Sequence, residues 1–250
     1  MKQNRKQVRK VALITGAARR IGAVIAGHLH QAGYRVAIHY HQSEAEANSL
    51  ALQFNQQQAD SARIFCQNLS SLEKGEQLIE PVINWAGRLD LLVNNASQFT
   101  KNHFENFDET LWHTLFKLNT QVPYQLSQAA LPYLKKQQGV IVNITDIHAE
   151  IPLKEYAIYC QTKAALLMQT RALAKEFAPL VRVNAVAPGS IAWPEKENRL
   201  SEQMQQKIIA ETPLKRHGHP DFIAKAVLSI ANNEFITGQV LNVDGGRSLR

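Results

Sequence analysis

VALITGAARRIG, residues 11–22, is the stretch that decides the fold. Val11 to Thr15 read as a β-strand, which runs into a glycine-containing turn and then a helix from about Ile21 to Ala32, with Gly33 suited to end it. Backbone N–H groups of such a turn, together with the helix dipole, can receive a diphosphate. An ordinary strand–helix turn is the alternative, so the motif needs support from the rest of the chain.

Short β-like runs and longer helical stretches alternate along the whole chain. The sequence predicts strands over 11–15, 35–40, 62–69, 89–96, 139–145, 181–189 and 239–246, and helices over 21–32, 44–57, 72–86, 108–136, 156–178, 198–211 and 220–231. Pro123 marks a kink or join in the fourth helix, and Ser43 with Glu46 forms a capping box for helix 44–57. This alternation predicts an α/β fold with a parallel sheet covered on both faces.

The composition favours one soluble domain. The chain has 250 residues, 45% of them hydrophobic, but no apolar stretch near the roughly 20 residues that a membrane span needs. The N-terminus lacks the apolar centre of a secretory signal, and two cysteines make no disulfide framework. We therefore expect a cytoplasmic protein without a membrane contact, with a flexible basic tail over residues 1–7 and one domain over 8–250.

Five of the cations behind the net charge of +7 lie in the first ten residues: Lys2, Arg5, Lys6, Arg9 and Lys10. The other cations are scattered along the chain. A small ligand rich in phosphate needs only local positive charge, so we expect such a ligand and no nucleic acid.

Two further motifs support a ligand site. NNAS (94–97) closes the fourth predicted strand and PGS (188–190) closes the sixth, both at the carboxyl edge where ligands of parallel sheets bind. With the first turn, these motifs supply the candidate cofactor contacts Gly16, Arg20, Ile21, Asn95, Ala96, Ser97, Pro188, Gly189 and Ser190.

HYHQS, at the end of the second predicted strand, indicates which dinucleotide binds. A carboxylate in this place accepts the ribose hydroxyls of NAD and repels a 2′-phosphate, whereas His39, Tyr40, His41 and Ser43 offer donors without negative charge. Arg20 adds a guanidinium suited to phosphate. We therefore expect NADPH. The alternative is that His39 is a strand residue and His41 faces solvent. The two histidines could also bind a metal ion, but no third His, Cys or carboxylate with ligand spacing stands near them, so we expect no metal.

The chemistry is indicated by YCQTK (159–163) and by Asp146, which follows the apolar run VIVNI. Tyr159 and Lys163 lie four residues apart and therefore share one helix face. A neighbouring ammonium favours phenolate, which predicts a lowered pKa and a useful acid at Tyr159. Lys163 would also hold the nicotinamide ribose, and Asn119 would fix a water that passes protons to it. Alone, the Tyr–Lys spacing also fits an amphipathic helix without chemistry.

Together, TGAARRIG, NNAS, Asn119, Asp146, YCQTK, APGS and ITGQVLNVDGG resemble the short-chain dehydrogenase/reductase family over roughly residues 8–250. The resemblance implies a Rossmann-type, doubly wound, seven-stranded sheet, a bound nicotinamide dinucleotide and usually a homotetramer. It also implies that Asn119, Tyr159 and Lys163 are catalytic.

Two departures from the common family pattern narrow the resemblance. Arg20 stands where most members have a third glycine, and Asp146 where most have serine. With HYHQS, AEANSLA, NNASQF and DGGRSLR, they resemble the pteridine reductases and dihydromonapterin reductases. This implies a pterin stacked between the nicotinamide and Phe99, with Arg20 and Ser97 contacting its polar edge or the cofactor phosphates, and Asp146 and Tyr159 as the proton-donating pair.

Other positions depart from the pteridine reductase pattern. Gln42 stands where arginine is frequent, and Asn68, followed by Leu69, replaces an aspartate beside the adenine. Phe99 also fits a core aromatic. Trp193 lines the substrate mouth or packs beneath the segment after it. Arg250 either reaches a neighbouring subunit or ends an untethered tail.

Asp146 favours a C=N substrate over a ketone. A carboxylate repels the oxyanion formed from a ketone, whereas a reduced C=N bond needs a proton on nitrogen. A structural aspartate that caps the following loop is the alternative. The sequence thus predicts NADPH-dependent reduction of a dihydrobiopterin-like or dihydromonapterin-like pterin, with dihydrofolate as a further substrate. A 3-oxoacyl or similar ketone reductase is the second hypothesis, and a cofactor-binding regulator without catalysis is the third.

Overall fold

The computed structural model describes residues 9–103, 105–193 and 200–249. A seven-stranded sheet runs in the order β3-β2-β1-β4-β5-β6-β7, and every pairing is parallel. The strands are β1 (Val11–Ile14), β2 (Arg35–Tyr40), β3 (Ala62–Cys66), β4 (Leu91–Asn94), β5 (Val140–Ile144), β6 (Arg182–Pro188) and β7 (Val240–Val243). The strand order reverses between β1 and β4, where ligands of such sheets bind. The predicted doubly wound Rossmann-type sheet is confirmed.

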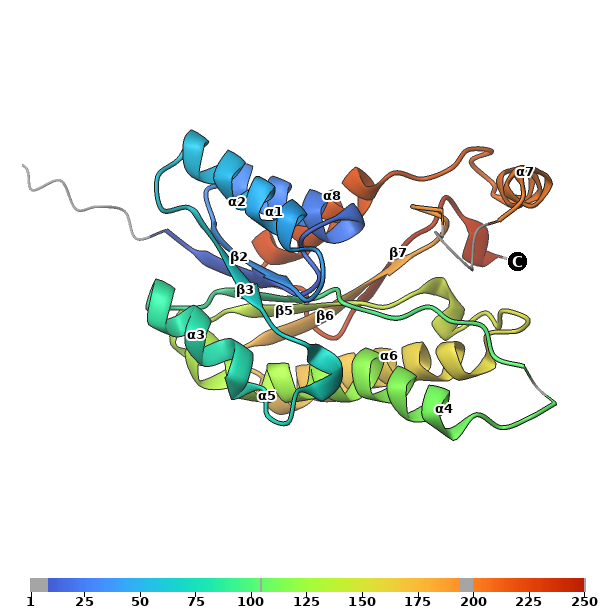
Figure 1. Ribbon diagram of the computed structural model, residues 1–250, viewed down its shortest axis with the longest axis horizontal. Helices are drawn as coiled ribbons and strands as arrows, with labels where there is room; N and C mark the ends of the chain where they lie inside the picture. The colour runs from blue at the N-terminus through green and yellow to red at the C-terminus, as the bar shows by residue number, and fades with distance from the viewer. Residues whose placement is uncertain (1–8, 104, 194–199, 250) are drawn as a thin grey trace, which may run out of the picture.

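Helices form a layer on each face of the sheet (Figure 1). One layer holds α1 (Arg20–Gln31), α2 (Glu44–Gln57) and α8 (Pro220–Asn232). The other holds α3 (Glu76–Ala86), α4 (Glu109–Phe116), α5 (Val122–Gln137) and α6 (Ala157–Phe177). The short helix α7 (Glu202–Glu211) lies apart from both layers, near the carboxyl end of β7.

The central strands are buried on both faces. Every residue of β1, β4 and β5 is buried, as expected for apolar strands of a covered parallel sheet. Side chains alternate between the faces, so Ala12 and Ile14 join the core under α1 and α8, whereas Val11 and Leu13 join the core under α3 and α5. The carboxyl edge of this rigid sheet carries the candidate site.

Three local details refine the sequence predictions. The helix expected over 108–136 is interrupted by a π-helical turn, Lys117–Gln121, and Pro123 stands at the start of α5, so the predicted join is confirmed. Ser43 precedes α2 but its side chain accepts no cap hydrogen bond, so the predicted capping box is wrong. The reason is backbone geometry: ψ of 59° is far from the extended value of a capping residue. The third strand ends at Cys66, opposite the last residue of β2, and a 3₁₀ turn, Leu69–Ser71, follows it.

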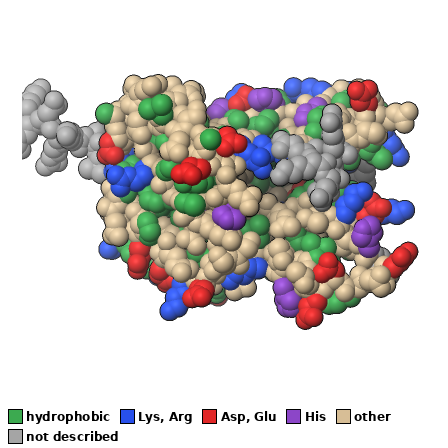
Figure 2. Space-filling model, viewed as in Figure 1, with side chains coloured by type: hydrophobic (Ala, Val, Ile, Leu, Met, Phe, Trp, Pro, Cys, Tyr) green, Lys and Arg blue, Asp and Glu red, His purple; other side chains and the backbone are tan. Residues whose placement is uncertain are grey.

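Acidic and basic side chains are interspersed on the face drawn in Figure 2. In the part of the chain that the structure describes, no helix is long and apolar enough to cross a membrane. The basic tail predicted over residues 1–7 and Arg250 lie outside the described residues.

The glycine turn brings α1 against the ends of β1 and β4. Gly16 has φ +62°, a left-handed conformation that favours glycine. A Cβ added at Gly22 would lie 2.2 Å from the Gly16 carbonyl oxygen and 2.7 Å from Asn95 Nδ2. Only glycine therefore lets the first turn of α1 pack this closely.

We expect Gly22→Ala to lower the free energy of unfolding by about 3 kcal/mol, because the methyl group overlaps backbone that has no room to move. Gly27 is a matched control in the same helix, since an added Cβ meets nothing within 4 Å. Gly27→Ala should raise stability by about 0.5–1 kcal/mol through its better helix propensity. Urea unfolding of both variants measures the difference, and equal effects of the two changes would contradict the close packing at Gly22.

Candidate active site

Hydrogen bonds join the glycine turn of residues 15–22, called the phosphate turn below after its expected ligand, to the NNAS motif. The Thr15 hydroxyl accepts from the backbone N–H groups of Asn95 and Ala96, both at 2.9 Å. In return, Asn95 Nδ2 donates to the carbonyls of Thr15 at 2.8 Å and Gly16 at 3.1 Å. Thr15 and Gly22 are site residues that the sequence reasoning missed. Their signal is the TG pair at the strand end with a second glycine six positions later.

His39 supports the turn from behind. It is buried, its Nδ1 accepts the Gly16 N–H at 3.0 Å, and its Nε2 donates to the Gln67 carbonyl at 3.0 Å. Burial lowers the pKa of His39 to about 4, so the ring is neutral at physiological pH. The prediction that its side chain offers a donor to a phosphate is wrong, because both ring nitrogens already have hydrogen-bond partners. The alternative given above, that His39 is a buried residue of the second strand, is the one the structure shows. Tyr40 is also buried.

His41 and Ser43 lie beyond the end of β2, exposed and half-buried respectively. No carboxylate stands between Tyr40 and Ser43. Nearby, the Asn68 side chain accepts from the Ser70 N–H at 3.0 Å and so starts the 3₁₀ turn that holds Leu69. Ile21 is half-buried at the start of α1 and packs on the core.

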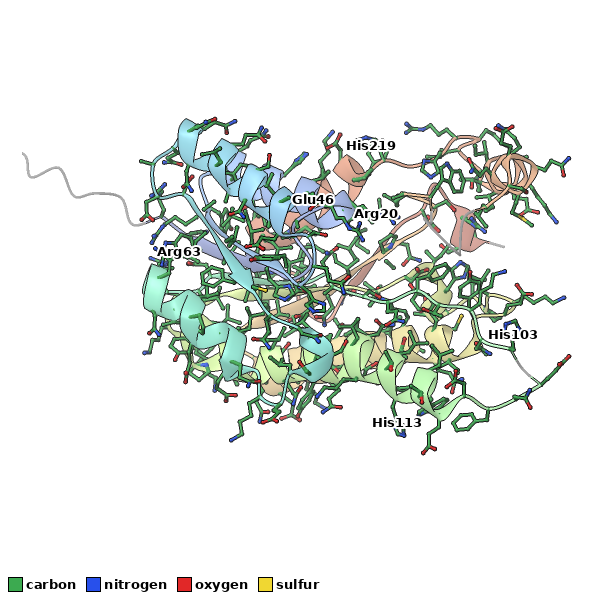
Figure 3. The ribbon with its side chains drawn as sticks, in the orientation of Figure 1. Arg20, Glu46, Arg63, His103, His113 and His219 are labelled. Atoms are coloured by element: carbon green, nitrogen blue, oxygen red, sulfur yellow. The ribbon has the colours of Figure 1, made fainter. Side chains whose placement is uncertain are left out.

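Arg20 spans from the turn to the chain after β6. Its φ is 54°, and its Nη2 donates to the carbonyls of Trp193 at 3.0 Å and Ala192 at 3.4 Å. The indole of Trp193 packs on His217 with the ring centroids 4.1 Å apart. Figure 3 shows Arg20 at the start of α1, between the helix layer of α1 and α8 and the chain near α7. Arg20 thus bridges the phosphate turn and the segment after PGS.

The PGS motif is backed by the last residues of the chain. Gly189 donates its N–H to the Val243 carbonyl at 3.1 Å, and an added Cβ would lie 2.6 Å from Asp244 Cβ. The Ser190 hydroxyl accepts from Arg247. The structure therefore brings Pro188, Gly189 and Ser190 to the same sheet edge as the phosphate turn and NNAS, as predicted.

Tyr159 and Asp146 are in direct contact. The Tyr159 hydroxyl donates to Asp146 Oδ2 at 2.7 Å. The other oxygen, Oδ1, accepts the His148 N–H at 2.9 Å and caps the 3₁₀ turn Ile147–Ala149. The two roles considered for Asp146, partner of the phenol and cap of the following loop, are therefore realised together. Tyr159 itself is buried.

Lys163 lies behind this pair. Its Nζ donates to the Ile144 carbonyl at 3.0 Å and lies 5.7 Å from the centroid of the Tyr159 ring. Burial lowers the pKa of Lys163 to about 8, against a smaller raising effect of Asp146. Burial, and then the charge and hydrogen bond of Asp146, raise the pKa of Tyr159 well above its usual value. The predicted lowering of the phenol pKa is wrong for the free protein, because the carboxylate contacts the hydroxyl while the ammonium bonds a carbonyl.

The buried side-chain amide of Asn119 joins the segment after β4 to α6 by hydrogen bonds. Its Oδ1 accepts from Ser97 Oγ at 3.1 Å and Gln98 N–H at 2.9 Å. Its Nδ2 donates to the Gln98 carbonyl at 3.0 Å and to Thr162 Oγ1 at 3.1 Å. Asn119 thus ties the NNAS strand end to α6, from a π-helical turn of the kind often found at functional sites. Its water-holding role stays a prediction.

Phe99 lies at the site rather than in the core. Its ring stacks on Tyr156, with centroids 4.2 Å apart and planes 12° apart, and meets Tyr159 edge-on at 4.8 Å. Phe99 is half-buried. An aromatic wall therefore stands beside the phenol and carboxyl, and a flat ring is the kind of molecule that such a wall suits.

Comparisons with known proteins agree with this geometry. Residues 16–248 match the family model described as enoyl-(acyl carrier protein) reductase. The 3-oxoacyl-[acyl-carrier-protein] reductase FabG of Staphylococcus aureus (strain Mu50) is 32% identical over 241 residues, 95% of this chain and 97% of that protein. FabG of Staphylococcus epidermidis (strain RP62A) is 33% identical over 95% of this chain and 98% of its own length.

A solved structure is similar over nearly the full length. It is the crystal structure of FolM alternative dihydrofolate reductase 1 from Brucella canis complexed with NADP, with a TM-score of 0.88 and 31% identity over 97% of this chain and 96% of that one. Sheet order, phosphate turn and the Tyr–Lys pair define a nicotinamide-dependent oxidoreductase. The chain belongs to the short-chain dehydrogenase/reductase family, as the sequence predicted. The relatives' names divide between reduction of a 3-oxoacyl group and of dihydrofolate.

Lys163 predicts a pH dependence of stability. Below pH 8 the folded protein must hold a buried ammonium, and this cost disappears as pH rises from about 8 to the ordinary lysine value of 10.5. Between pH 8 and 10.5 the free energy of unfolding of the wild type should therefore rise by about 3 kcal/mol relative to that of Lys163→Met, because methionine does not titrate. Urea unfolding of both proteins from pH 7 to 10.5 tests this, and a constant difference would contradict the depressed pKa.

Proposed function

We propose that the protein is an NADPH-dependent pteridine reductase, which converts a dihydropterin to its tetrahydro form. A dihydrobiopterin-like or dihydromonapterin-like compound, or dihydrofolate, is the substrate class. The observation that carries the proposal is the 2.7 Å hydrogen bond between the Tyr159 hydroxyl and Asp146. A carboxyl group joined to a phenol suits protonation of a ring nitrogen better than stabilisation of an oxyanion.

The cofactor side of the proposal rests on the phosphate turn. Gly16 and Gly22 lie so close together that a side chain at Gly22 has no room. Such close packing is expected where the backbone must come near a diphosphate. NADPH supplies the hydride when bound, and the solved relative in complex with NADP supports this choice. The contacting residues are Gly16, Arg20 and Ile21 at the diphosphate, His41 and Ser43 at the 2′-phosphate, Asn68 and Leu69 at the adenine, and Asn95, Ala96, Ser97, Pro188, Gly189, Ser190 and Lys163 at the nicotinamide half.

Tyr159 is the proton donor in this proposal, and Asp146 is its hydrogen-bond partner. With its pKa raised, Tyr159 holds its proton at neutral pH, and a carboxylate at 2.7 Å disfavours the phenolate that would remain after donation. In the proposed step the Tyr159 hydroxyl gives its proton to the substrate ring nitrogen. The Lys163 ammonium, 5.7 Å from the ring centroid, favours the same direction of transfer.

The substrate side of the proposal rests on Phe99. Its ring is held by Tyr156 on one face and by the edge contact with Tyr159. A pterin stacked beside this ring brings its ring nitrogen to the phenol, while Arg20 and Ser97 meet its polar edge. The aromatic wall favours flat heteroaromatic substrates.

A 3-oxoacyl reductase is the second candidate, because the FabG relatives cover almost the whole chain. Against it stands Asp146, whose carboxylate repels the oxyanion of a reduced ketone. With either substrate we propose a homotetramer, the usual assembly of the family. Exposed apolar side chains on the α5 and α6 layer support self-association, notably Tyr124 and Met168, which are 48% and 59% exposed.

A substrate panel tests the proposed function. NADPH oxidation should proceed with dihydrobiopterin and more slowly with dihydrofolate, and a 3-oxoacyl thioester should react at least about 100-fold less efficiently by kcat/KM. With NADH in place of NADPH the pterin reaction should weaken, because residues 41–43, directly after β2, offer the ribose polar donors and no carboxylate. Turnover of the thioester alone would favour the second candidate. Cofactor binding without any turnover would favour the regulator.

Asp146 can be tested by two substitutions that separate its roles. Asp146→Asn keeps an oxygen for the His148 N–H but loses the acid, whereas Asp146→Ser leaves a single hydroxyl oxygen for the two contacts. We expect both variants to lower kcat with dihydrobiopterin about 100-fold and to leave the NADPH dissociation constant within about twofold. Full activity of Asp146→Asn would mean that only the cap matters.

A further inference from the structure

The helix that carries Tyr159 and Lys163 does not cap itself. The first four N–H groups of a helix have no partner within it. Tyr156 is the residue before α6, and its side chain makes no cap hydrogen bond. Tyr159 stands only two positions after Ala157, where α6 begins, in a turn that depends on partners outside the helix.

Asn102 supplies such a partner from 56 positions earlier in the chain. Its Oδ1 accepts the Ile158 N–H at 3.1 Å. Its own N–H donates to the Glu155 carbonyl at 2.7 Å. Glu155 has φ +69°, so the chain turns sharply just before the helix. Asn102 therefore holds both sides of the turn that leads into α6. Figure 3 labels its neighbour His103, near the end of α6 where the helix begins.

The same loop carries Phe99, whose ring contacts Tyr156 and Tyr159. It also carries Lys101, whose Nζ lies 2.9 Å from Glu155 Oε2, with both side chains well exposed. An exposed ion pair contributes little to rigidity. The half-buried Asn102 is therefore the polar contact of this loop that fixes the first turn of α6.

We propose that Asn102 is a positioning residue, which caps α6 from the loop after β4 and sets the distance of the Tyr159 hydroxyl from Asp146 and from the Phe99 ring. The phenol bond to Asp146 is 2.7 Å long, so a displacement of about 1 Å in the first turn of α6 breaks it. Such displacements cost up to about 100-fold in rate. The inference rests on the proposed role of Tyr159 as proton donor.

The test compares Asn102→Ala, Asn102→Asp and Lys101→Ala. Asn102→Ala should lower kcat about 10-fold and leave the NADPH dissociation constant within about threefold. Asn102→Asp keeps the acceptor and suits a helix N-terminus, so kcat should return to within about threefold of wild type. Lys101→Ala, the matched change in the same loop, should stay within about twofold. If Asn102→Ala does not fold, Asn102→Gln, which displaces the amide oxygen by one carbon, replaces it with the same expected fall.

The assays run with whichever substrate the wild type reduces, at a temperature where circular dichroism shows every variant folded. If the wild type reduces only the 3-oxoacyl thioester, the proposed substrate is wrong, but the effect of the Asn102 substitutions on kcat can still be measured with the thioester. An unchanged kcat in Asn102→Ala, a fall that Asn102→Asp does not restore, or an equal fall in Lys101→Ala would overturn the positioning role.

Discussion

The hydrogen bonds around the Gly16 turn are the constraint on which the rest of the structure depends. Thr15, Asn95 and His39 join the ends of β1, β4 and β2 through the turn's backbone. His39 serves this purpose because burial keeps its ring neutral, with one nitrogen accepting and the other donating. The edge of the sheet is thereby rigid where a dinucleotide needs its phosphates received, and α1 begins directly above it.

Hydrogen bonds of buried amide side chains also fix α6 against β4 and β5. Asn94 on β4 donates to Asn143 Oδ1 on β5 at 2.8 Å, and Asn143 Nδ2 donates to Thr170 on α6 at 2.9 Å. Nearer the site, Asn119 bonds Thr162 on the same helix at 3.1 Å. The helix of Tyr159 and Lys163 is thus held at two levels against elements that also shape the cofactor edge. Sites built on rigid elements keep the short distances that proton transfer needs.

Periodicity and motif spacing were enough to predict the strand and helix order and the carboxyl-edge motifs, and the family resemblance implied the pairing of Asp146 with Tyr159; all of these appear in the structure. The sequence predictions were wrong where the role of a side chain depends on its three-dimensional surroundings, which the sequence does not show directly. The HYHQS motif does not reveal that His39 points into the core, and Ser43 fails as a cap because of its ψ. The pKa of Tyr159 depends on burial and on which charge reaches its oxygen. Asn102 escaped notice because its partner is 56 residues away.

Asp146 uses its two oxygens for different partners, the phenol and the backbone of the following loop. A serine, with one hydroxyl oxygen on a shorter side chain, does not span both. A change from aspartate to serine at this position therefore alters the contact with the phenol and the support of residues 147–149 together. One side chain thus links the proton-donating pair to the shape of the loop after β5, so a change in one is also a change in the other.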